Sequence, residues 1–421
     1  ARAVRYMGHA VYTNKMPAGA LRGYGVTQGT FALESAINEL AAKLQMDPAE
    51  LREKNIIREG EAHPVLGETP EGKPVVLASS ALDRCIKRGK ELIGWGEKYP
   101  RKVVSDTKVR AVGMAITMQG SGIAGIDTAS AVIKLNDGGF YTLLLGSTDM
   151  GTGSDTTMAQ IAAEVLETSM DKIIVHAADT DISHYDTGSY ASSTAYVTGN
   201  AVIRAAEDMK KKIIEAGAKL LGVDSEEIEF DGEFVRAINK HQSLSLDEMA
   251  RLLISGEGKL QLVGTGTFGG DTSPPPFIAG FAEVEVDTET GKIDVIEYVA
   301  VVDCGTMINP NLVRIQAEGG LVQGIGMAMY EDVKYSERGK MQTDTFMQYK
   351  IPCRKDIGKI TVDFEPSYEP TGPFGAKSVG EVVINTPSPA IAHAVYNAVG
   401  VNIRNLPITP EKVLMGIMEK K

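Results

Sequence analysis

The stretch Gly375-Ala376-Lys377-Ser378-Val379-Gly380-Glu381 lies near the C-terminus of a 421-residue chain and runs directly into the apolar residues Val382 to Ile384. A carboxylate that follows a tight turn without a spacer cannot reach water if the fold buries that turn. Glu381 would then face a site, where a carboxylate is suited to proton transfer. The alternative is that Glu381 accepts backbone N–H groups where the next helix begins.

Composition limits what the rest of the chain can be. A chain of 421 residues exceeds the size of one hydrophobic core, and 43% hydrophobic with 23% charged residues is typical of a soluble globular protein. The net charge of −12 is spread along the chain, which argues against a nucleic-acid or anionic-membrane surface. No run of 18 apolar residues is present, so no membrane span is predicted.

The cysteines argue against a metal centre held by thiolates. Cys85, Cys304 and Cys353 lie far apart, without CxxC or Cys/His spacing. An iron–sulfur cluster or structural zinc in this chain is therefore not expected. A sparse, odd cysteine count is typical of a reducing compartment, which predicts a cytoplasmic protein.

The first hundred residues predict one strand and several helices. Residues 4–14 have the β-branched and aromatic content of a strand. A helix is predicted between Gly25 and about Met46, because Phe31, Leu33, Ile37, Leu40 and Leu44 recur at helical spacing. Asp47-Pro48 predicts the cap and first turn of a second helix. Residues 95–110 are basic and polar and form the best candidate boundary.

Beyond the boundary, strands and helices follow in blocks, which predicts an α+β fold of mixed sheets with flanking helices. Asp137-Gly138-Gly139 predicts a hairpin turn. Four glycines in the helix after Asn309-Pro310 predict close packing there, since each costs roughly 1 kcal/mol against Ala. The predicted strands are 112–117, 130–136, 140–145, 172–177, 228–234, 278–286 and 293–302, and the predicted helices are 80–94, 157–167, 201–221, 245–255, 310–330 and a last helix at 389–399.

Polar, glycine-bearing loops suggest an anion site. Loop 149–156 precedes a helix, whose N-terminal N–H groups would face a bound anion. Loop 190–194 adds hydroxyl and amide donors. The glycines of 319–326 lie in a helical pattern without a preceding strand, so a dinucleotide fingerprint is a poor interpretation. A plain turn explains any one of these loops, and the missing phosphate-binding lysine motif counts against a nucleotide-binding module.

Five motifs in this order together resemble the molybdenum hydroxylases, the family of xanthine dehydrogenase and aldehyde oxidase. The similarity covers nearly the whole chain and matches the later part of the molybdopterin-binding region. It implies two subdomains, with residues 1–100 completing the first and residues 101–421 forming the second. The motifs are Ala20-Leu21-Arg22-Gly23-Tyr24-Gly25, Met150-Gly151-Thr152-Gly153, Tyr190-Ala191-Ser192-Ser193, Val322-Gln323-Gly324 and Lys377-Ser378-Val379-Gly380-Glu381.

The resemblance also implies roles for individual residues. Glu381 matches the general base that deprotonates a hydroxyl on the molybdenum, and Arg22 matches an arginine that steadies negative charge on the substrate. The metal is held by the pterin, so no protein side chain is expected to ligate it. A plain helix-surface arginine is an equal alternative for Arg52. The positions that match cofactor contacts are Arg52, Gly151, Thr152, Ala191, Ser192, Ser193, Thr194, Gln323, Lys377, Ser378, Val379 and Gly380.

Three departures from the family pattern shape the expected function. Thr152 stands where many relatives have Gln. No aromatic clamp for a planar substrate is evident around 116–120, so Gln119 and Gly120 are the candidate substrate contacts. The earlier molybdenum subdomain is absent from this sequence. That arrangement resembles nicotinate dehydrogenase, in which two polypeptides share one molybdenum site.

The resemblance therefore implies a molybdopterin subunit that hydroxylates an aromatic N-heterocycle, purine-like or nicotinate-like, with water as the oxygen source. The cofactor would be molybdopterin, plain or as the cytosine dinucleotide. Partners would be a second molybdopterin subunit, an iron–sulfur subunit and an FAD subunit. The alternatives are a reductive relative such as 4-hydroxybenzoyl-CoA reductase, an aldehyde oxidoreductase, and a non-catalytic half that completes a partner's site.

Overall fold

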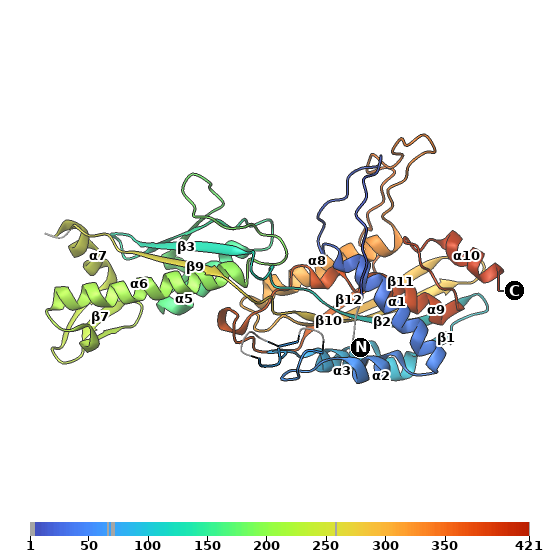
Figure 1. Cartoon of the computed structure of the whole chain (residues 1–421), viewed down its shortest axis with the longest axis horizontal. Helices are drawn as coiled ribbons and strands as arrows, with labels where there is room; N and C mark the ends of the chain where they lie inside the picture. The colour runs from blue at the N-terminus through green and yellow to red at the C-terminus, as the bar shows by residue number, and fades with distance from the viewer. Residues whose placement is uncertain (1–4, 65–66, 69–71, 257–258, 421) are drawn as a thin grey trace.

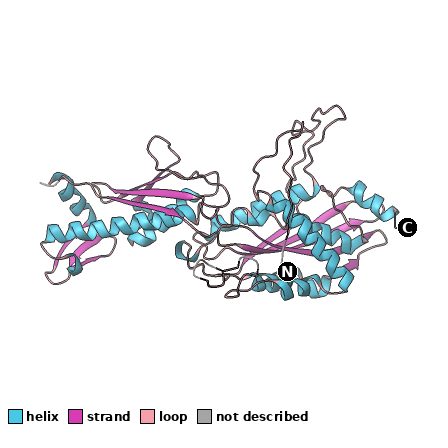
Figure 2. Cartoon of the chain, viewed as in Figure 1, coloured by secondary structure: helices cyan, strands magenta, loops and turns pink. Residues whose placement is uncertain are grey.

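The computed structural model describes residues 5–64, 67–68, 72–256 and 259–420. It confirms an α+β fold of mixed sheets with flanking helices, arranged as two lobes along the longest axis (Figures 1 and 2). The helices are α1 (Val26–Leu44), α2 (Pro48–Asn55), α3 (Leu82–Ile93), α4 (Trp95–Lys98), α5 (Ser154–Leu166), α6 (Val197–Leu221), α7 (Leu246–Ser255), α8 (Pro310–Met329), α9 (Pro387–Val399) and α10 (Pro410–Met418). The strands are β1 (Arg101–Val103), β2 (Lys108–Met118), β3 (Thr128–Leu135), β4 (Tyr141–Leu145), β5 (Ile173–Ala177), β6 (Ile228–Phe230), β7 (Phe234–Ala237), β8 (Gln242–Ser245), β9 (Val263–Gly269), β10 (Phe277–Asp287), β11 (Ile293–Asp303) and β12 (Lys359–Phe364).

The larger lobe is built on a five-stranded sheet in the order β1-β2-β10-β11-β12. Strand β10 runs antiparallel to both β2 and β11, and β12 joins β11 in parallel. The two faces of β10 pack against different helices, since Phe281 packs with Trp95 on the α3 side and Ile278 packs with the α8 and α9 side. Both faces of the sheet are therefore covered, which makes it a rigid platform for the loops at its ends.

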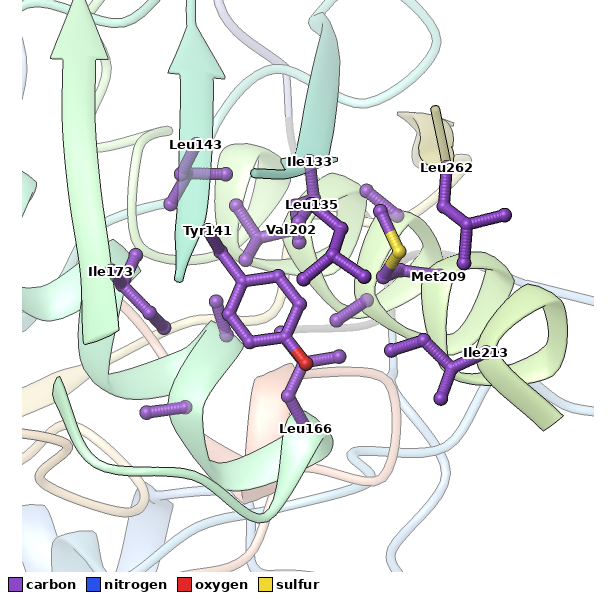
Figure 3. Close-up of a cluster of buried hydrophobic side chains, with 14 of the residues drawn as sticks. Ile133, Leu135, Tyr141, Leu143, Leu166, Ile173, Val202, Met209, Ile213 and Leu262 are labelled. Carbon is purple, nitrogen blue, oxygen red and sulfur yellow. The ribbon is translucent and has the colours of Figure 1, made fainter. Parts of the chain in front are cut away.

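The smaller lobe has its own core. Its four-stranded sheet, β5-β4-β3-β9, packs against α5 and α6, and a second small sheet, β6-β7-β8, lies beyond it with α7. Figure 3 shows the core of this lobe, where Tyr141 and Leu143 of β4 share a cluster with Met209 of α6. On β9, a Cβ at Gly264 would lie 2.4 Å from the carbonyl oxygen of Ala205. Helix α6 can approach the sheet that closely only because β9 carries glycine there.

The N-terminal helices do not form a separate body. Helix α3 packs on β10 and β11, and α1 packs on α9. Ala49 and Leu82 share one hydrophobic cluster with Met114 of β2 and Val299 of β11. The break between hydrophobic cores consequently falls between the two lobes rather than at residues 95–110.

The predicted strand at the N-terminus is wrong over the part that the structure describes. Residues 5–20 are exposed and pair with no described strand, because the segment projects away from the sheets and a lone extended segment has no ladder to stabilise it (Figure 1). The largely exposed loop 331–351 rises next to this segment (Figure 1). The backbone N–H of Met16 donates to the Tyr335 hydroxyl at 3.2 Å, and Lys15 Nζ lies 5.8 Å from the centre of the same ring. We call 5–20 and 331–351 the two arms.

Helix α1 has the predicted extent, but the predicted apolar face is wrong. Leu33, Leu40 and Leu44 are exposed, whereas the buried positions are largely polar. The cause is that α1 lies against groups that need hydrogen bonds. The Glu34 carboxylate, for example, accepts the backbone N–H of Ile116 at 2.7 Å. The buried residues of the helix are Thr27, Thr30, Glu34, Asn38 and Ala41.

Most other predicted elements are confirmed within a few residues. The hairpin β3–β4 is antiparallel, Asp47 caps α2, and Asn309 caps α8. Two predictions are wrong: the strand over 228–234 is divided by a turn into β6 and β7, and α10 follows the helix that was expected to be the last. Among the described residues, no helix has the length and apolar character that a membrane crossing needs.

Candidate active site

Glu381 is half-buried where the turn 377–380 meets a short 3-10 helix, η4 (Val382–Ile384). Its carboxylate makes no capping hydrogen bond to that helix, so the alternative of a helix cap does not describe it. Oε1 instead accepts the backbone N–H of Gly23 at 3.3 Å. Oε2 accepts the Ser192 hydroxyl at 3.1 Å and the side-chain NH₂ of Gln119 at 3.4 Å. Three segments that are distant in sequence thus converge on one carboxylate.

Ser192 approaches Glu381 from a strained loop. Ala191 and Ser192 have φ values of 50° and 56°, in the left-handed region that non-glycine residues rarely adopt. The loop is held by a hydrogen bond from the Gly122 N–H to the Ala191 carbonyl at 2.9 Å. The Ser192 hydroxyl also accepts the backbone N–H of Glu381 at 3.1 Å. Such strain costs on the order of 1–3 kcal/mol per residue and is commonly retained where it places a functional group.

Arg22 is joined to the backbone on both sides of the site. Its Nε donates to the Gly380 carbonyl at 2.5 Å, and one terminal nitrogen donates to the Gln316 carbonyl at 2.9 Å. Burial lowers the pKa of the Arg22 guanidinium, and the nearby Glu381 carboxylate opposes that shift. In this arrangement Arg22 links the 377–380 turn to helix α8.

Helix α8 comes close to Arg22 because it carries glycine at the contact. A Cβ on Gly320 would lie 2.4 Å from Val383 and 3.0 Å from the Arg22 guanidinium. The next turn is equally close, since a Cβ on Gly324 would lie 2.6 Å from Pro387. The prediction of close packing is confirmed at these two glycines, but a Cβ on Gly319 would meet nothing within 4 Å.

In the loop before α5, backbone N–H groups are occupied by the carboxylate of Asp149, a residue of the same loop. The Asp149 carboxylate accepts the N–H groups of Gly151 at 2.9 Å, Gly153 at 3.1 Å and Asp155 at 3.4 Å. Burial alone would raise the pKa of Asp149, but these backbone N–H groups lower it. The hypothesis that these N–H groups are free to cradle a bound anion is therefore wrong. Thr152 also points to Asp149, with Oγ1 and Oδ1 3.5 Å apart.

The remaining motif residues at the turn are buried supports. The Lys377 ammonium donates to Asp303 at 2.8 Å, and both side chains are fully buried. Ser378 donates from its hydroxyl to the Gly120 carbonyl at 2.9 Å and from its backbone N–H to Ser121 Oγ at 3.0 Å. These contacts fix the backbone that carries Glu381. Val379 packs partly buried against the core of the larger lobe.

The other predicted residues lie further from Glu381 in the hydrogen-bond network. Arg52 is buried and donates to Glu34 at 2.7 Å, to Asn38 and to the Pro48 carbonyl, so the alternative of a surface arginine is also wrong. Gln323 is half-buried on α8. Ser193 donates to the Gly188 carbonyl at 2.9 Å, and Thr194 lies half-buried just before α6.

Sequence reasoning missed several residues of this site. Gly23 supplies a backbone donor, and Gln316 connects Arg22 with Gly151, whose carbonyl accepts its side-chain amide at 3.2 Å. Asn385 donates to the Gln119 side chain at 3.0 Å from only four residues beyond Glu381. Gly23 stood inside a quoted motif, whereas Gln316 and Asn385 had no sequence signal, because only the fold brings their segments together.

No group of three or more His, Cys, Asp or Glu side chains within the described ranges is arranged to hold a metal ion. Two family models match the chain, both described as a molybdopterin cofactor-binding domain. One matches residues 88–358 and the other residues 1–56.

The chain is similar to larger proteins along nearly its whole length. It is 38% identical over 414 residues to "Probable hypoxanthine oxidase XdhD" of Escherichia coli (strain K12), covering 96% of this chain and 43% of that protein. It is 30% identical to the nicotine 6-hydroxylase large subunit of Paenarthrobacter nicotinovorans, covering 98% and 52%. The crystal structure of quinoline 2-oxidoreductase from Pseudomonas putida 86 superposes with a TM-score of 0.85 at 27% identity, covering 96% and 54%. The chain spans about half the length of these relatives. On these matches, the chain belongs to the molybdopterin-binding family of the molybdenum hydroxylases, the family of xanthine dehydrogenase and aldehyde oxidoreductase.

Proposed function

We propose that this chain is the part of a molybdenum hydroxylase that carries the catalytic base, and that the complete enzyme hydroxylates an aromatic N-heterocycle with oxygen from water. The observation that supports this most directly is the position of the Glu381 carboxylate. It is turned away from its own helix and faces donors from three other segments. A carboxylate held in this way has a fixed direction in which to accept a proton.

The residues around Glu381 fit a polar, phosphate-bearing cofactor. Gly151 is exposed with a φ of +94°, and a Cβ there would meet nothing within 4 Å. A ligand can therefore approach its Cα, although its N–H is held by Asp149. In the same region, the buried hydroxyls of Ser147 and Ser154 have no hydrogen-bond partner among the described residues. When bound, a molybdopterin with its molybdenum would supply the redox chemistry of a hydroxylation. We assign its contacts to Gly151, Thr152, Ala191, Ser192, Ser193, Thr194, Gln323 and Gly380, with Lys377, Ser378 and Val379 holding the turn and Arg52 holding α1 against α2.

The chain's own residues have distinct parts in the reaction. Glu381 accepts, at a carboxylate oxygen, the proton that leaves the oxygen nucleophile. Arg22 provides a fixed positive charge beside the site while it holds the Gly380 carbonyl. Gln119 and Gly120 are the proposed substrate contacts. The side-chain NH₂ of Gln119 also donates a hydrogen bond to the Glu381 carboxylate.

A heterocyclic substrate is supported by the relatives rather than by a shaped pocket. Their names refer to hypoxanthine, nicotine and quinoline, all aromatic N-heterocycles. An aldehyde oxidoreductase is the second candidate, because the chain is also 31% identical to an aldehyde oxidoreductase molybdenum-binding subunit of Escherichia coli (strain K12). Turnover of hypoxanthine, nicotinate and benzaldehyde by the reconstituted complex distinguishes these two classes.

We further propose that a second molybdopterin polypeptide completes the site. The two arms display apolar side chains that the described residues leave uncovered: Tyr6 is 88% exposed, Phe346 84% and Met347 83%. Patches of this kind mark interfaces. The separate family matches, to residues 1–56 and 88–358, support two sequence units. We propose that 1–100, packed on the larger lobe, completes the first subdomain and that 101–421 forms the second. Iron–sulfur and FAD subunits would accept the electrons. Three unpaired cysteines support a cytoplasmic location.

Glu381→Gln tests the proposal. In the reconstituted complex, we expect turnover to fall about 10²–10⁴-fold, which is the usual contribution of a general base, while molybdenum and pterin content stay at the level of the parent. Glu318→Gln, at an exposed position of α8, is the matched control and should leave turnover unchanged. Near-normal turnover in the Glu381 variant would favour the alternative in which this chain is a non-catalytic half. Loss of pterin from it would make Glu381 a cofactor-binding residue.

A further inference from the structure

A buried chain of hydrogen bonds lies behind Glu381. The Thr27 hydroxyl, on the first turn of α1, donates to Asn385 Oδ1 at 3.0 Å. Asn385 Nδ2 donates to Gln119 Oε1 at 3.0 Å, and Gln119 Nε2 donates to Glu381 Oε2 at 3.4 Å. The exposed fractions are 6% for Thr27, 0% for Asn385 and 8% for Gln119, so water does not compete for the two bonds that join these side chains. The bond from Gln119 to Glu381 is part-buried.

The chain closes into a ring through Gly23. The Gly23 N–H donates to Oε1 of the same Glu381 carboxylate, and Gly23 lies one helical turn before Thr27. A Cβ on Gly23 would lie 2.4 Å from Thr27 Oγ1 and 2.7 Å from Asn385 Oδ1. The backbone there has a φ of +87°, which favours glycine independently. The ring therefore needs glycine at residue 23 in order to close around the two polar side chains.

Two side-chain amides that are hydrogen-bonded in series fix each other's orientation. Each amide has a donor end and an acceptor end, so turning one of them over forces the other to turn as well. With the Thr27 hydroxyl donating, Asn385 presents its NH₂ to Gln119, and Gln119 presents its NH₂ to Glu381. In the reverse order Gln119 would present its carbonyl oxygen to the carboxylate, which is repulsive.

We propose that Asn385 and Thr27 are positioning residues, which act through Gln119 to keep a hydrogen-bond donor on the Glu381 carboxylate. The inference rests on the proposed role of Glu381, since it names what keeps that carboxylate oriented. Each of the two residues sets the direction of the Gln119 amide.

Asn385→Asp is the decisive variant, because it keeps the shape of the side chain but can no longer donate to Gln119. Gln119 must then turn its NH₂ toward the new carboxylate and its oxygen toward Glu381. A melting-temperature cycle with Glu381→Gln measures this without cofactor, since an amide at position 381 can offer either a donor or an acceptor. We expect Asn385→Asp to lower the melting temperature of the chain by about 2 °C or more beyond its effect in the Glu381→Gln background. Equal losses in both backgrounds would overturn the proposal.

The complete complex provides a second measurement. The acid limb of the kcat/KM profile should move to higher pH by about one unit in Asn385→Asp. Thr27→Val, which lacks the hydroxyl, should move it in the same direction, and Thr27→Ser should restore the parent profile. A profile that shifts equally in the valine and serine variants would show that Thr27 only packs there. If the temperature cycle shows coupling while Glu381→Gln keeps its turnover, the positioning chain stands and the proposed base is wrong.

Discussion

Lys377 is predicted by family resemblance to contact the cofactor, yet the structure places its ammonium against Asp303 in the protein interior. Lys377→Met separates these two roles. The methionine fills a similar volume but removes the charge. A cofactor contact would affect pterin binding, whereas a buried ion pair would affect folding.

The expected loss of stability in Lys377→Met depends on the hydrogen-bond donors that Asp303 retains. Both side chains have an exposed fraction of 0%, and removing one partner of a buried pair costs about 3–5 kcal/mol. Asp303 retains three donors after the substitution: the N–H of Ala81 at 2.8 Å, the N–H of Gly305 at 3.0 Å and the hydroxyl of Ser367 at 2.6 Å. We therefore expect the lower end of the range, about 3 kcal/mol of unfolding free energy.

Urea unfolding of the whole chain measures this loss. Adding Asp303→Asn to the Lys377→Met variant should recover part of it, because no unpaired charge is then buried. Lys54→Met is the control, since Lys54 pairs with Glu50 on the surface at exposed fractions of 55% and 51% and should change the stability by less than about 1 kcal/mol. An unchanged urea midpoint in Lys377→Met, together with loss of pterin from the complex, would refute the structural role.

The remaining predictions concern the buried His393 and the glycines of α8. Burial lowers the pKa of His393 to about 3, with the charge of Arg52 adding to the effect. Because the unfolded chain then binds one more proton below the ordinary histidine pKa of 6.5, stability is complete above that pH and falls as the pH drops toward 3. Between about pH 8 and pH 5, His393 should lower the free energy of unfolding by about 2 kcal/mol. His393→Asn keeps an acceptor for the Met114 N–H and should remove this pH dependence in urea titrations. Gly324→Ala should lower the melting temperature by several degrees, because its Cβ would lie 2.6 Å from Pro387. Gly319→Ala, which has open space around it, should be neutral or stabilise by up to about 1 kcal/mol. Equal effects of the two substitutions would show that α8 does not need its glycines for contact.

Sequence patterns predicted the elements of this fold well where the signals were local. Asp47 and Asn309 cap their helices through side-chain oxygens, and the glycine turn at 137–139 joins two paired strands. The failures arise from long-range partners. Residues 5–14 have strand composition but pair with no strand in the part of the chain that the structure describes, and composition cannot supply the hydrogen bonds of a ladder. Helix α1 buries Glu34 because Arg52 and the Ile116 N–H compensate its charge, and neither partner could be inferred from the helix alone.

The sequence predicted the residues at the centre of the candidate site but not those that surround them. The motif residues Arg22, Ser192 and Glu381 do meet in the structure, although they lie up to 359 positions apart in the numbering. Their cofactor and catalytic roles stay predictions. Asn385 and Gln316 could not have been selected, because an asparagine after a short helix and a glutamine on an exposed helix turn carry no signal until the opposing segments are placed.

The two arms have consequences for the life of this polypeptide in the cell. A newly made chain that displays Tyr6, Phe346 and Met347 to water is prone to self-association and would be recognised by chaperones. If the proposed second molybdopterin polypeptide covers the arms, its production in matched amounts becomes a condition for accumulating the enzyme, and an unassembled surplus would be cleared by proteolysis. On that proposal, the apolar side chains that join the two polypeptides would also limit how much of the complex can be made.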